Sequence, residues 1–322
     1  MKEIEILDRT IFVGDPPRSG TTFAAKSLNL HPDIVAAIDD HVYECWGLYY
    51  YRDRVGLVHE LRTRELTPEQ VKESLKSHLI VDNRLMGAAP SIKTAGCPQL
   101  AKIDSPFPGS ARSVLDTDLG RHAIPLDQFS SDWRLCLKSP EISFVLPQLA
   151  GHFPGSRFVL VYRPVSEIAE SMYRLGNRVI QFPVFHKRWL KEKDGAGKLI
   201  PPPGVPAEWN RLWQKASDFQ RCVIYAAAYI RGMLEGVSQL TPDRYLIYNH
   251  AHLRNSPDEI YQRLSAFLNV DASGFQPAVT QLNTGIPAIH RKLAKEYSKI
   301  EAKLGLKPMM KQIETLNSCQ FV

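Results

Sequence analysis

Short apolar runs alternate with helical patterns through the first half of the chain, and this alternation restricts the fold more than any other feature. Short apolar runs bounded by turn residues are typical of buried strands. Strands that alternate with helices form a parallel sheet that is covered by helices on both faces. We therefore expect an α/β fold with a central parallel sheet. The predicted strands are 10–13, 34–38, 134–137, 157–162 and 244–248, and the predicted helices are 21–30, 142–152, 165–175, 206–240 and 257–268.

The length of 322 residues allows one large α/β domain or two smaller ones, and we interpret residues 1–322 as a single domain. A hydrophobic fraction of 44% is ample for a sizeable core. The stretch 181–206 is rich in turn residues and is either a surface loop or a lid over the substrate. The segment 87–128 shows no clear period, so no element is assigned to it.

Charge and cysteine content exclude several classes of protein. The formal net charge is +6 without a long Lys/Arg run, which does not indicate a nucleic-acid partner but suits a small anionic ligand. The five cysteines are scattered without a CxxC pair, so neither a disulfide framework nor a zinc site is expected. No signal peptide and no apolar run of about 20 residues is present, so we expect a cytoplasmic protein without a membrane partner.

The loop GDPPRSGTT, from Gly14 to Thr22, lies between the first predicted strand and the first predicted helix. A glycine-rich loop in this position directs backbone N–H groups and the positive end of a helix toward an anion. Nucleotide-binding loops of kinases read G-x-x-x-x-G-K-[ST]. In this chain Thr21 stands where the lysine would be, and the cation of the loop is Arg18 instead.

The end of the predicted strand 157–162 carries a second cation. Magnesium-using P-loop enzymes place an acidic residue at the end of a buried strand. Here the strand is followed by Arg163, which would repel magnesium and attract another phosphate. The sequence therefore predicts metal-free anion binding, with a second cationic position one strand–helix unit from the loop.

These residues resemble the sulfotransferases that use 3′-phosphoadenosine 5′-phosphosulfate (PAPS). The loop matches the family motif P-[RK]-S-G-T-T at every position, a strand-end Arg is followed eight residues later by Ser, and a K-x-P motif lies between the two. The resemblance, which is to the tyrosylprotein and bacterial small-molecule branches, implies the P-loop-like sulfotransferase fold. It implies that the 5′-phosphosulfate is held by Pro17, Arg18, Ser19, Gly20, Thr21 and Thr22, that the 3′-phosphate is held by Arg163 and Ser171, and that the K-x-P lysine is Lys138.

The chain departs from the family pattern in two places. Many relatives read Arg-Asp-Pro after the strand, whereas this chain reads Arg163-Pro164, and the R-K-G-x-x-G segment is missing. A third contact to the 3′-phosphate must then come from elsewhere, for which Arg291 and Lys292 are candidates. A straight helix from Pro164 would place Ser171 about 10 Å along its axis, so sharing a phosphate with Arg163 requires a later helix start or a curled entry.

The resemblance also implies the reaction. A sulfuryl group moves from PAPS to an acceptor, and adenosine 3′,5′-bisphosphate is released without a metal. Arg18 and Lys138 would neutralise the charge on the transferred group and the bridging oxygen. The acceptor needs a base, and Asp39 is the first candidate because it follows a predicted strand and aligns with the glutamate base of the tyrosylprotein branch. Asp40 is the next candidate, ahead of His41, Glu44 and Glu141, and a plain polar turn is the alternative for the Asp pair.

The acceptor that we expect is a hydroxyl group of a small molecule. The aromatic-rich segment 42–51 either lines an apolar acceptor pocket or belongs to the core. Three other functions remain open at this point: a sulfotransferase for a carrier-tethered or peptide acceptor, a P-loop kinase, and a non-catalytic protein that binds adenosine bisphosphate.

Overall fold

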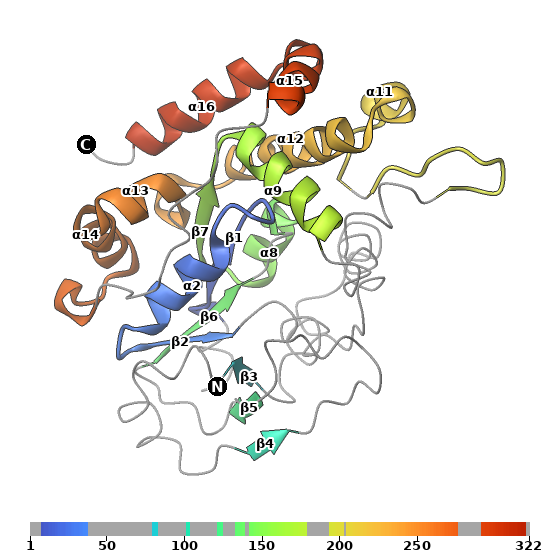
Figure 1. The fold of residues 1–322 in the computed structure, drawn as a ribbon. Coiled ribbons are helices and arrows are strands. Elements are labelled where there is room, and N and C mark those ends of the chain that lie inside the picture. Colours follow the sequence, from blue (N-terminus) through green and yellow to red (C-terminus); the bar gives the residue numbers. More distant parts are fainter. Residues whose placement is uncertain are drawn as a thin grey trace.

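The computed structural model describes residues 8–37, 79–82, 101–103, 121–124, 133–138, 142–178, 193–202, 204–275 and 291–319. Its centre is a five-stranded sheet in which every neighbouring pair of strands is parallel (Figure 1). In spatial order the strands are β2 (Ile34–Ala37), β6 (Arg134–Lys138), β1 (Ile11–Gly14), β7 (Arg157–Tyr162) and β8 (Tyr245–Asn249).

Helices cover both faces of this sheet, as the alternation of strands and helices predicts. Side chains of a strand point alternately to its two faces. On β1, Phe12 belongs to one core cluster, whereas Ile11 and Val13 belong to the other. The cluster of Phe12 includes residues of α8 (Leu146–His152), α9 (Val165–Arg178), α12 (Asp218–Val237), α15 (Arg291–Leu304) and α16 (Leu306–Cys319). The cluster of Ile11 includes residues of α2 (Thr21–Asn29), α13 (His250–Asn255) and α14 (Pro257–Leu268).

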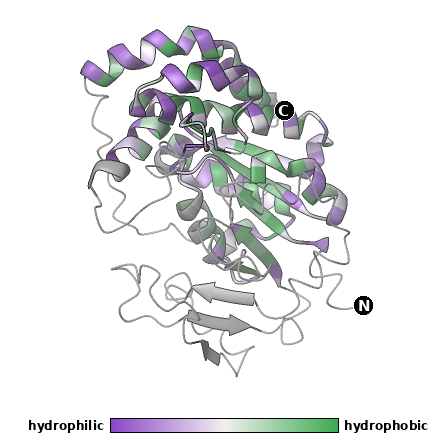
Figure 2. Ribbon diagram, turned by 90° about the vertical axis from the view of Figure 1, so that its right-hand side faces the viewer, coloured by the Kyte–Doolittle hydropathy of each residue, from purple (hydrophilic) through white to green (hydrophobic). Residues whose placement is uncertain are grey.

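The hydropathy of the ribbon follows the same division. Figure 2 shows hydrophobic strands between helices that also carry hydrophilic residues. The buried side chains of α12 occupy most of its circumference. The reason is that this helix packs against α9, α15 and α16 and also contributes to the core cluster that contains Phe12. The α/β fold class predicted from the sequence is confirmed.

The predicted helix 206–240 is divided in the structure into η3 (Ala207–Trp209), α11 (Asn210–Lys215) and α12. The division occurs at Ser217, whose backbone is extended, with φ −68° and ψ 165°. The Ser217 hydroxyl accepts a hydrogen bond from Gln220 N, and the Gln220 side chain accepts one from Ser217 N. This reciprocal cap satisfies the first N–H groups of a new helix, so one continuous helix was the wrong prediction.

Other boundaries differ less. The predicted helix 142–152 consists of η2 (Ile142–Phe144) and α8, with Val145 between them in a non-helical conformation. The predicted strand 244–248 begins one residue later, because η4 (Pro242–Arg244) precedes it. A small antiparallel sheet of β3 (Leu79–Asp82), β5 (Arg121–Ile124) and β4 (Ala101–Ile103) was not predicted, and two of its strands lie in the unassigned segment 87–128.

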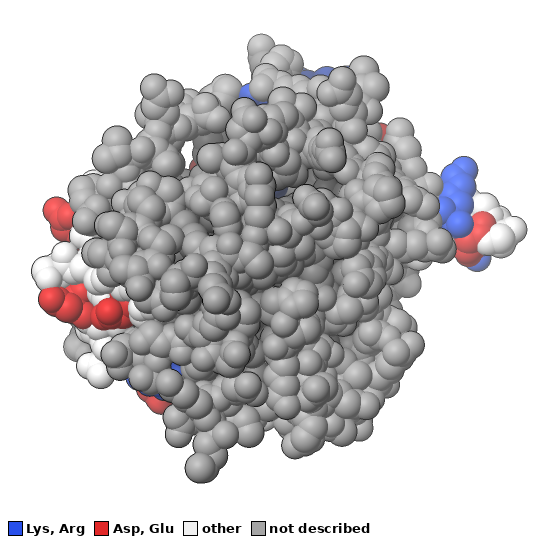
Figure 3. Space-filling view, turned by 90° about the horizontal axis from the view of Figure 1, so that it is seen from below, with Lys and Arg blue, Asp and Glu red and all other residues white. Residues whose placement is uncertain are grey.

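The turn-rich stretch 181–206 is described from residue 193 to 202 and from 204 onward. Lys193 and Leu199 form an isolated antiparallel bridge, and Asp194 Oδ1 accepts from the N–H groups of Ala196 and Lys198, both at 2.9 Å. This turn protrudes at the right-hand margin of Figure 1 and of the view from below, where basic and acidic side chains occur together (Figure 3). The lid and the single domain both stay predictions.

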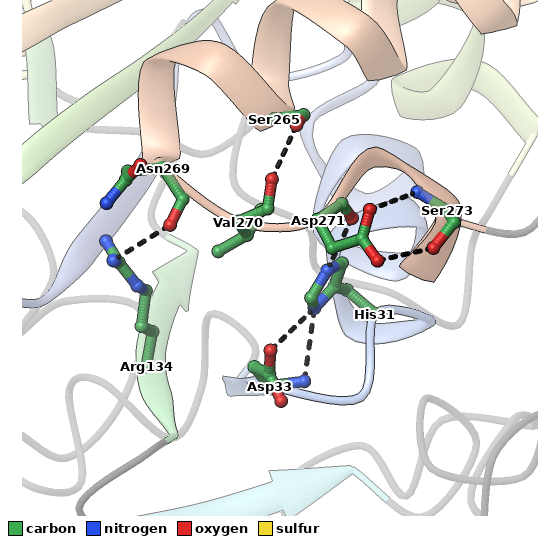
Figure 4. Close-up of polar contacts among 8 residues, drawn as sticks. All are labelled: His31, Asp33, Arg134, Ser265, Asn269, Val270, Asp271 and Ser273. Carbon is green, nitrogen blue, oxygen red and sulfur yellow. Dashed lines mark hydrogen bonds and ion pairs between the residues drawn. The ribbon is translucent and has the colours of Figure 1, made fainter.

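The amino ends of the parallel strands lie at one side of the sheet, here called its amino edge. His31 connects this amino edge to the end of α14 (Figure 4). The ring is fully buried, its Nδ1 accepts from Asp33 N at 3.1 Å, and its Nε2 lies 2.9 Å from Asp271 O. Because Nδ1 accepts, Nε2 carries the proton and donates to the carbonyl oxygen. The ring also packs against Phe275, with the centroids 4.9 Å apart. His31 therefore joins the turn before β2 to the turn after α14.

The same edge holds a second connection between these elements. Asn269 ends α14 in the left-handed conformation, with φ 54°, and the Arg134 guanidinium donates to its carbonyl oxygen at 3.3 Å (Figure 4). Since Arg134 is the first residue of β6, the start of this strand is fixed against α14. These contacts stabilise the amino edge and leave the opposite edge for the candidate site.

Candidate functional site

The carboxyl ends of the five parallel strands meet at one edge of the sheet, where α/β proteins place their ligands. Lys138 is the last residue of β6, the loop with Arg18 follows β1, Arg163 follows β7, and His250 follows β8. Because β6, β1, β7 and β8 are successive neighbours in the sheet, these residues form a row along its edge. Three members of the row are cationic side chains, so the edge suits an anion with more than one negative group.

The loop after β1 has the backbone of an anion cradle. Ser19 N donates to Pro16 O at 2.9 Å, which closes a turn, and Ser19 Oγ donates to Asp15 O at 3.0 Å. Arg18 and Gly20 then have φ values of 75° and 102°, outside the range that most residues adopt. Such alternation of backbone conformation lets successive N–H groups converge on one point.

Helix α2 starts directly at the end of this loop. Its first backbone bond runs from Ala24 N to Gly20 O at 3.0 Å. The N–H groups of the preceding turn have no partner within a helix and point away from its N-terminus, where the helix dipole favours negative charge. The predicted loop residues take their places here: Pro17 and Arg18 in the turn, the buried Ser19, Gly20, then Thr21 and Thr22 as the first residues of α2.

Arg18 connects the loop to helix α9. Its Nε donates to Ser171 Oγ at 3.2 Å, and Arg18 is exposed at the surface. Helix α9 begins at Val165, immediately after Pro164, so Ser171 lies about 9 Å along the axis from the helix start. The helix does not start later than this, and the predicted role of Ser171 at the 3′-phosphate stays a prediction.

Lys138 lies beside the loop at the end of the neighbouring strand. Its backbone is opposite Val13 in the register of β1 and β6, and only 3% of the residue is exposed. A buried ammonium group is costly unless charge or hydrogen bonds compensate it. Ser139 and Pro140 of the same motif lie outside the described residues.

Arg163 contacts a residue that the sequence motifs did not identify. Its Nη2 lies 2.8 Å from Nδ1 and 3.0 Å from Nε2 of His250. Only 6% of His250 is exposed, and its ring meets that of Phe23 edge-on, with the centroids 5.9 Å apart. The sequence held one signal for this position, since His250 is the first residue after a strand that ends at the same edge of the sheet.

The predicted base and acceptor residues lie outside the described part of the chain. These are Asp39, Asp40, His41, Glu44, Glu141 and the aromatic segment 42–51. The last described residue before them is Ala37, which pairs with Leu137 next to Lys138. The roles of these residues stay predictions. Lys292 lies exposed on α15, and its predicted role at the 3′-phosphate, like that of Arg291, also stays a prediction.

Two further observations concern cofactors and membranes. Within the described ranges, no group of three or more His, Cys, Asp or Glu side chains is placed to hold a metal ion. None of the helices that the structure describes is long and apolar enough to cross a bilayer.

Comparisons with known proteins agree with this fold. A family model described as "Sulfotransferase family" matches residues 10–192, which include the loop, Lys138, Arg163 and Ser171. A sulfotransferase from Alicyclobacillus acidocaldarius is similar in structure, with a TM-score of 0.50, 10% sequence identity and 96% of each chain covered.

Two other solved structures resemble the chain more distantly. The sulfotransferase domain from the Synechococcus PCC 7002 olefin synthase has a TM-score of 0.46 at 16% identity, with 98% of this chain and 95% of that chain covered. The sulfotransferase domain from the curacin biosynthetic pathway has the same TM-score and identity, with 96% and 97% covered. The comparison with curated proteins found no matching relative. The family model spans more than half of the sequence, and the chain therefore belongs to the sulfotransferase family.

Proposed function

We propose that this sulfotransferase moves the sulfuryl group of PAPS to a hydroxyl group of a small-molecule acceptor and releases adenosine 3′,5′-bisphosphate. The observation that carries the proposal is the row of Lys138, Arg18 and Arg163 at the carboxyl ends of three adjacent strands. PAPS has negative groups at both the 5′ and the 3′ position, and a row of separated cations suits both.

The residues present fit such a donor. The left-handed backbone at Arg18 and Gly20 and the start of α2 offer converging N–H groups to the 5′-phosphosulfate. Arg163 follows the next strand along the sheet, at the position that the resemblance assigns to the 3′-phosphate. Ser171 is within hydrogen-bond distance of Arg18, which supports a site that includes the loop and α9 together.

The proposed reaction requires the protein to stabilise the departing phosphate and to remove a proton from the acceptor. The bond between sulfur and the bridging oxygen of the 5′-phosphate breaks while a bond forms between sulfur and the acceptor oxygen. Negative charge then grows on the departing phosphate, and Arg18 and Lys138 would stabilise it. The acceptor hydroxyl gives up its proton, for which Asp39 is our first candidate and Asp40 the second.

Two other classes of function would use the same fold. A P-loop kinase is disfavoured because Thr21 replaces the loop lysine and because Arg163 stands where a magnesium-binding acid is expected. A protein that only binds adenosine bisphosphate would not need a lysine buried beside the loop. A carrier-tethered or peptide acceptor remains an alternative within the same reaction.

Turnover with labelled PAPS tests the proposal. The protein is incubated in EDTA with a panel of phenols and alcohols, and transfer of label is measured for the wild type, Lys138→Met and the control Lys198→Met. We expect transfer by the wild type and a fall in kcat of about 10²–10³ for Lys138→Met, the scale for one donor to a transition state. Lys198 lies exposed on the protruding turn, so its variant should match the wild type.

Two results would contradict the proposal. Tight binding of PAPS without transfer to any acceptor in the panel would contradict a small-molecule acceptor and would favour the binding protein or a carrier-tethered or peptide acceptor. Transfer of phosphate from ATP with magnesium, in the absence of sulfuryl transfer, would favour the kinase.

A further inference from the structure

His250 is enclosed by the residues that begin the candidate nucleotide site. It is the first residue of α13, and its ring packs edge-on against Phe23 of α2. The ring also lies directly over Gly20, because a Cβ atom added to Gly20 would come within 1.9 Å of His250 Cδ2. The imidazole thus has little freedom to leave the position between the loop and the end of β7.

The backbone on both sides fixes where this ring lies. Tyr162 and Asn249 are paired in the register of β7 and β8, so Arg163 and His250 are the next residues of two neighbouring strands. Asn249 ends β8 and caps α13, since its Oδ1 accepts from Ala251 N at 2.9 Å. The sheet and the cap together place His250 beside Arg163 before any side-chain contact is considered.

The side-chain contact has a defined direction. A guanidinium group only donates hydrogen bonds, so one of the two ring nitrogens of His250, both within 3.0 Å of Arg163 Nη2, accepts from it. An imidazolium has no lone pair to accept with, and the ring is therefore neutral in this arrangement. The guanidinium is a planar fork with five N–H groups, and the contact with His250 involves one of its nitrogens, Nη2.

We infer that His250 is a positioning residue for the nucleotide site, which holds Arg163 toward the 3′-phosphate of the donor. This inference rests on the proposed function, in which Arg163 binds that phosphate. An arginine side chain that is already fixed loses less conformational freedom when the ligand arrives, so binding is tighter. This gain in affinity requires the 3′-phosphate, which 5′-AMP lacks. His250 should therefore increase the preference for adenosine 3′,5′-bisphosphate over 5′-AMP.

The test compares the affinities of these two nucleotides by calorimetry in EDTA. The variants are His250→Leu, which cannot accept a hydrogen bond, His250→Gln, which can, and His252→Leu as a control on the exposed face of α13. For His250→Leu we expect the preference for the bisphosphate to fall about tenfold, the scale of one hydrogen bond to a charged group, while the affinity for 5′-AMP changes little. His250→Gln should keep most of the preference, and His252→Leu all of it.

A double-mutant cycle separates positioning from general damage. If His250 acts through Arg163, the variant His250→Leu/Arg163→Ala should prefer the bisphosphate no less than Arg163→Ala alone. Should His250→Leu not fold, His250→Ala, which also cannot accept a hydrogen bond, measures the same coupling in the presence and absence of Arg163.

Different results would overturn the two proposals. An unchanged preference in His250→Leu, or equal losses for both nucleotides, would overturn the role of His250 and leave the proposed function standing. If the wild-type protein binds 5′-AMP as tightly as the bisphosphate, the 3′-phosphate site itself is contradicted, and so is the role of His250.

Discussion

In the proposed reaction the acceptor hydroxyl loses a proton, and Asp39 is the residue that we predict to take it. Asp39→Asn should keep the affinity for PAPS and lose turnover by about 10²–10⁴-fold, the usual scale for a general base. Asn has nearly the size of Asp and accepts a hydrogen bond, but it cannot take up the proton. Donor affinity and kcat are measured separately to distinguish the two steps.

Asp40→Asn is the matched control for Asp39→Asn, and it should lower turnover much less. A more acidic acceptor, such as a nitrophenol, depends less on the base. The loss of turnover in Asp39→Asn should therefore be smaller with such an acceptor. If Asp40→Asn is the inactive variant and Asp39→Asn turns over normally, the base has been assigned one residue too early. If both are active, Glu44 or Glu141 becomes the next residue to vary.

Single residues of the site were predictable where the signal is contiguous in the sequence. The loop from Pro17 to Thr22 can be identified because one short motif contains the turn, the cation and the glycine. His250 was missed because its contact with Arg163 joins residues 87 positions apart. Only the pairing of β7 with β8 brings the two together, and neither residue carries a local signal of that pairing.

At the scale of elements, His31 joins α2, β2 and the end of α14 at the amino edge. His31→Ala should lower the free energy of unfolding by about 2–4 kcal/mol, because it removes two buried hydrogen bonds and the packing against Phe275. Urea denaturation measures the change. Asp33→Ala is the control, since the Asp33 side chain is half exposed and its backbone N–H remains to donate to the ring.

We expect Asp33→Ala to cost less than about 1 kcal/mol, because its half-exposed carboxylate faces a neutral ring and the variant keeps the backbone N–H that binds Nδ1. Equal losses in the two variants would mean that the Asp33 carboxylate, rather than the two hydrogen bonds of the ring, fastens α14 to the sheet.

Elements with a strong local pattern were predicted to within a residue or two. The strands of the large sheet are continuous apolar runs, and the predicted ranges 34–38 and 157–162 match β2 and β7 closely. The break before α12 was missed because apolar residues lie around most of the helix and hide its start, although Ser217 and Gln220 form a capping box. The strands β3, β4 and β5 have three or four residues each, too few to show a period.

At the scale of the whole molecule, burial of several tyrosines predicts how stability depends on pH. Burial raises the pKa of Tyr162 and of Tyr297 to about 12 and raises that of Tyr248 further. Unfolded tyrosines titrate near pH 10, so above about pH 10 the folded chain retains protons that the unfolded chain has lost. Stability is therefore complete below about pH 10 and falls as the pH rises toward about 12.

Two other groups change how stability depends on pH in this alkaline range. Burial also raises the pKa of the Cys222 thiol, which adds to the loss, whereas burial lowers the pKa of Arg263 to about 10 and acts in the opposite sense. We expect the melting temperature to fall by about 5 °C or more between about pH 9 and about pH 11, with tyrosinate absorbance rising as the protein unfolds. Ordinary titration of all tyrosines in a protein that stays folded would contradict this prediction.

We propose that the cationic row at the carboxyl ends of the strands binds a bisphosphorylated nucleotide without a metal. The most direct measurement is calorimetric titration with adenosine 3′,5′-bisphosphate in excess EDTA, compared with ATP and magnesium under otherwise equal conditions. The bisphosphate should bind with the same Kd with and without EDTA, and more tightly than ATP with magnesium. Loss of bisphosphate binding in EDTA, or tighter binding of ATP with magnesium, would contradict it.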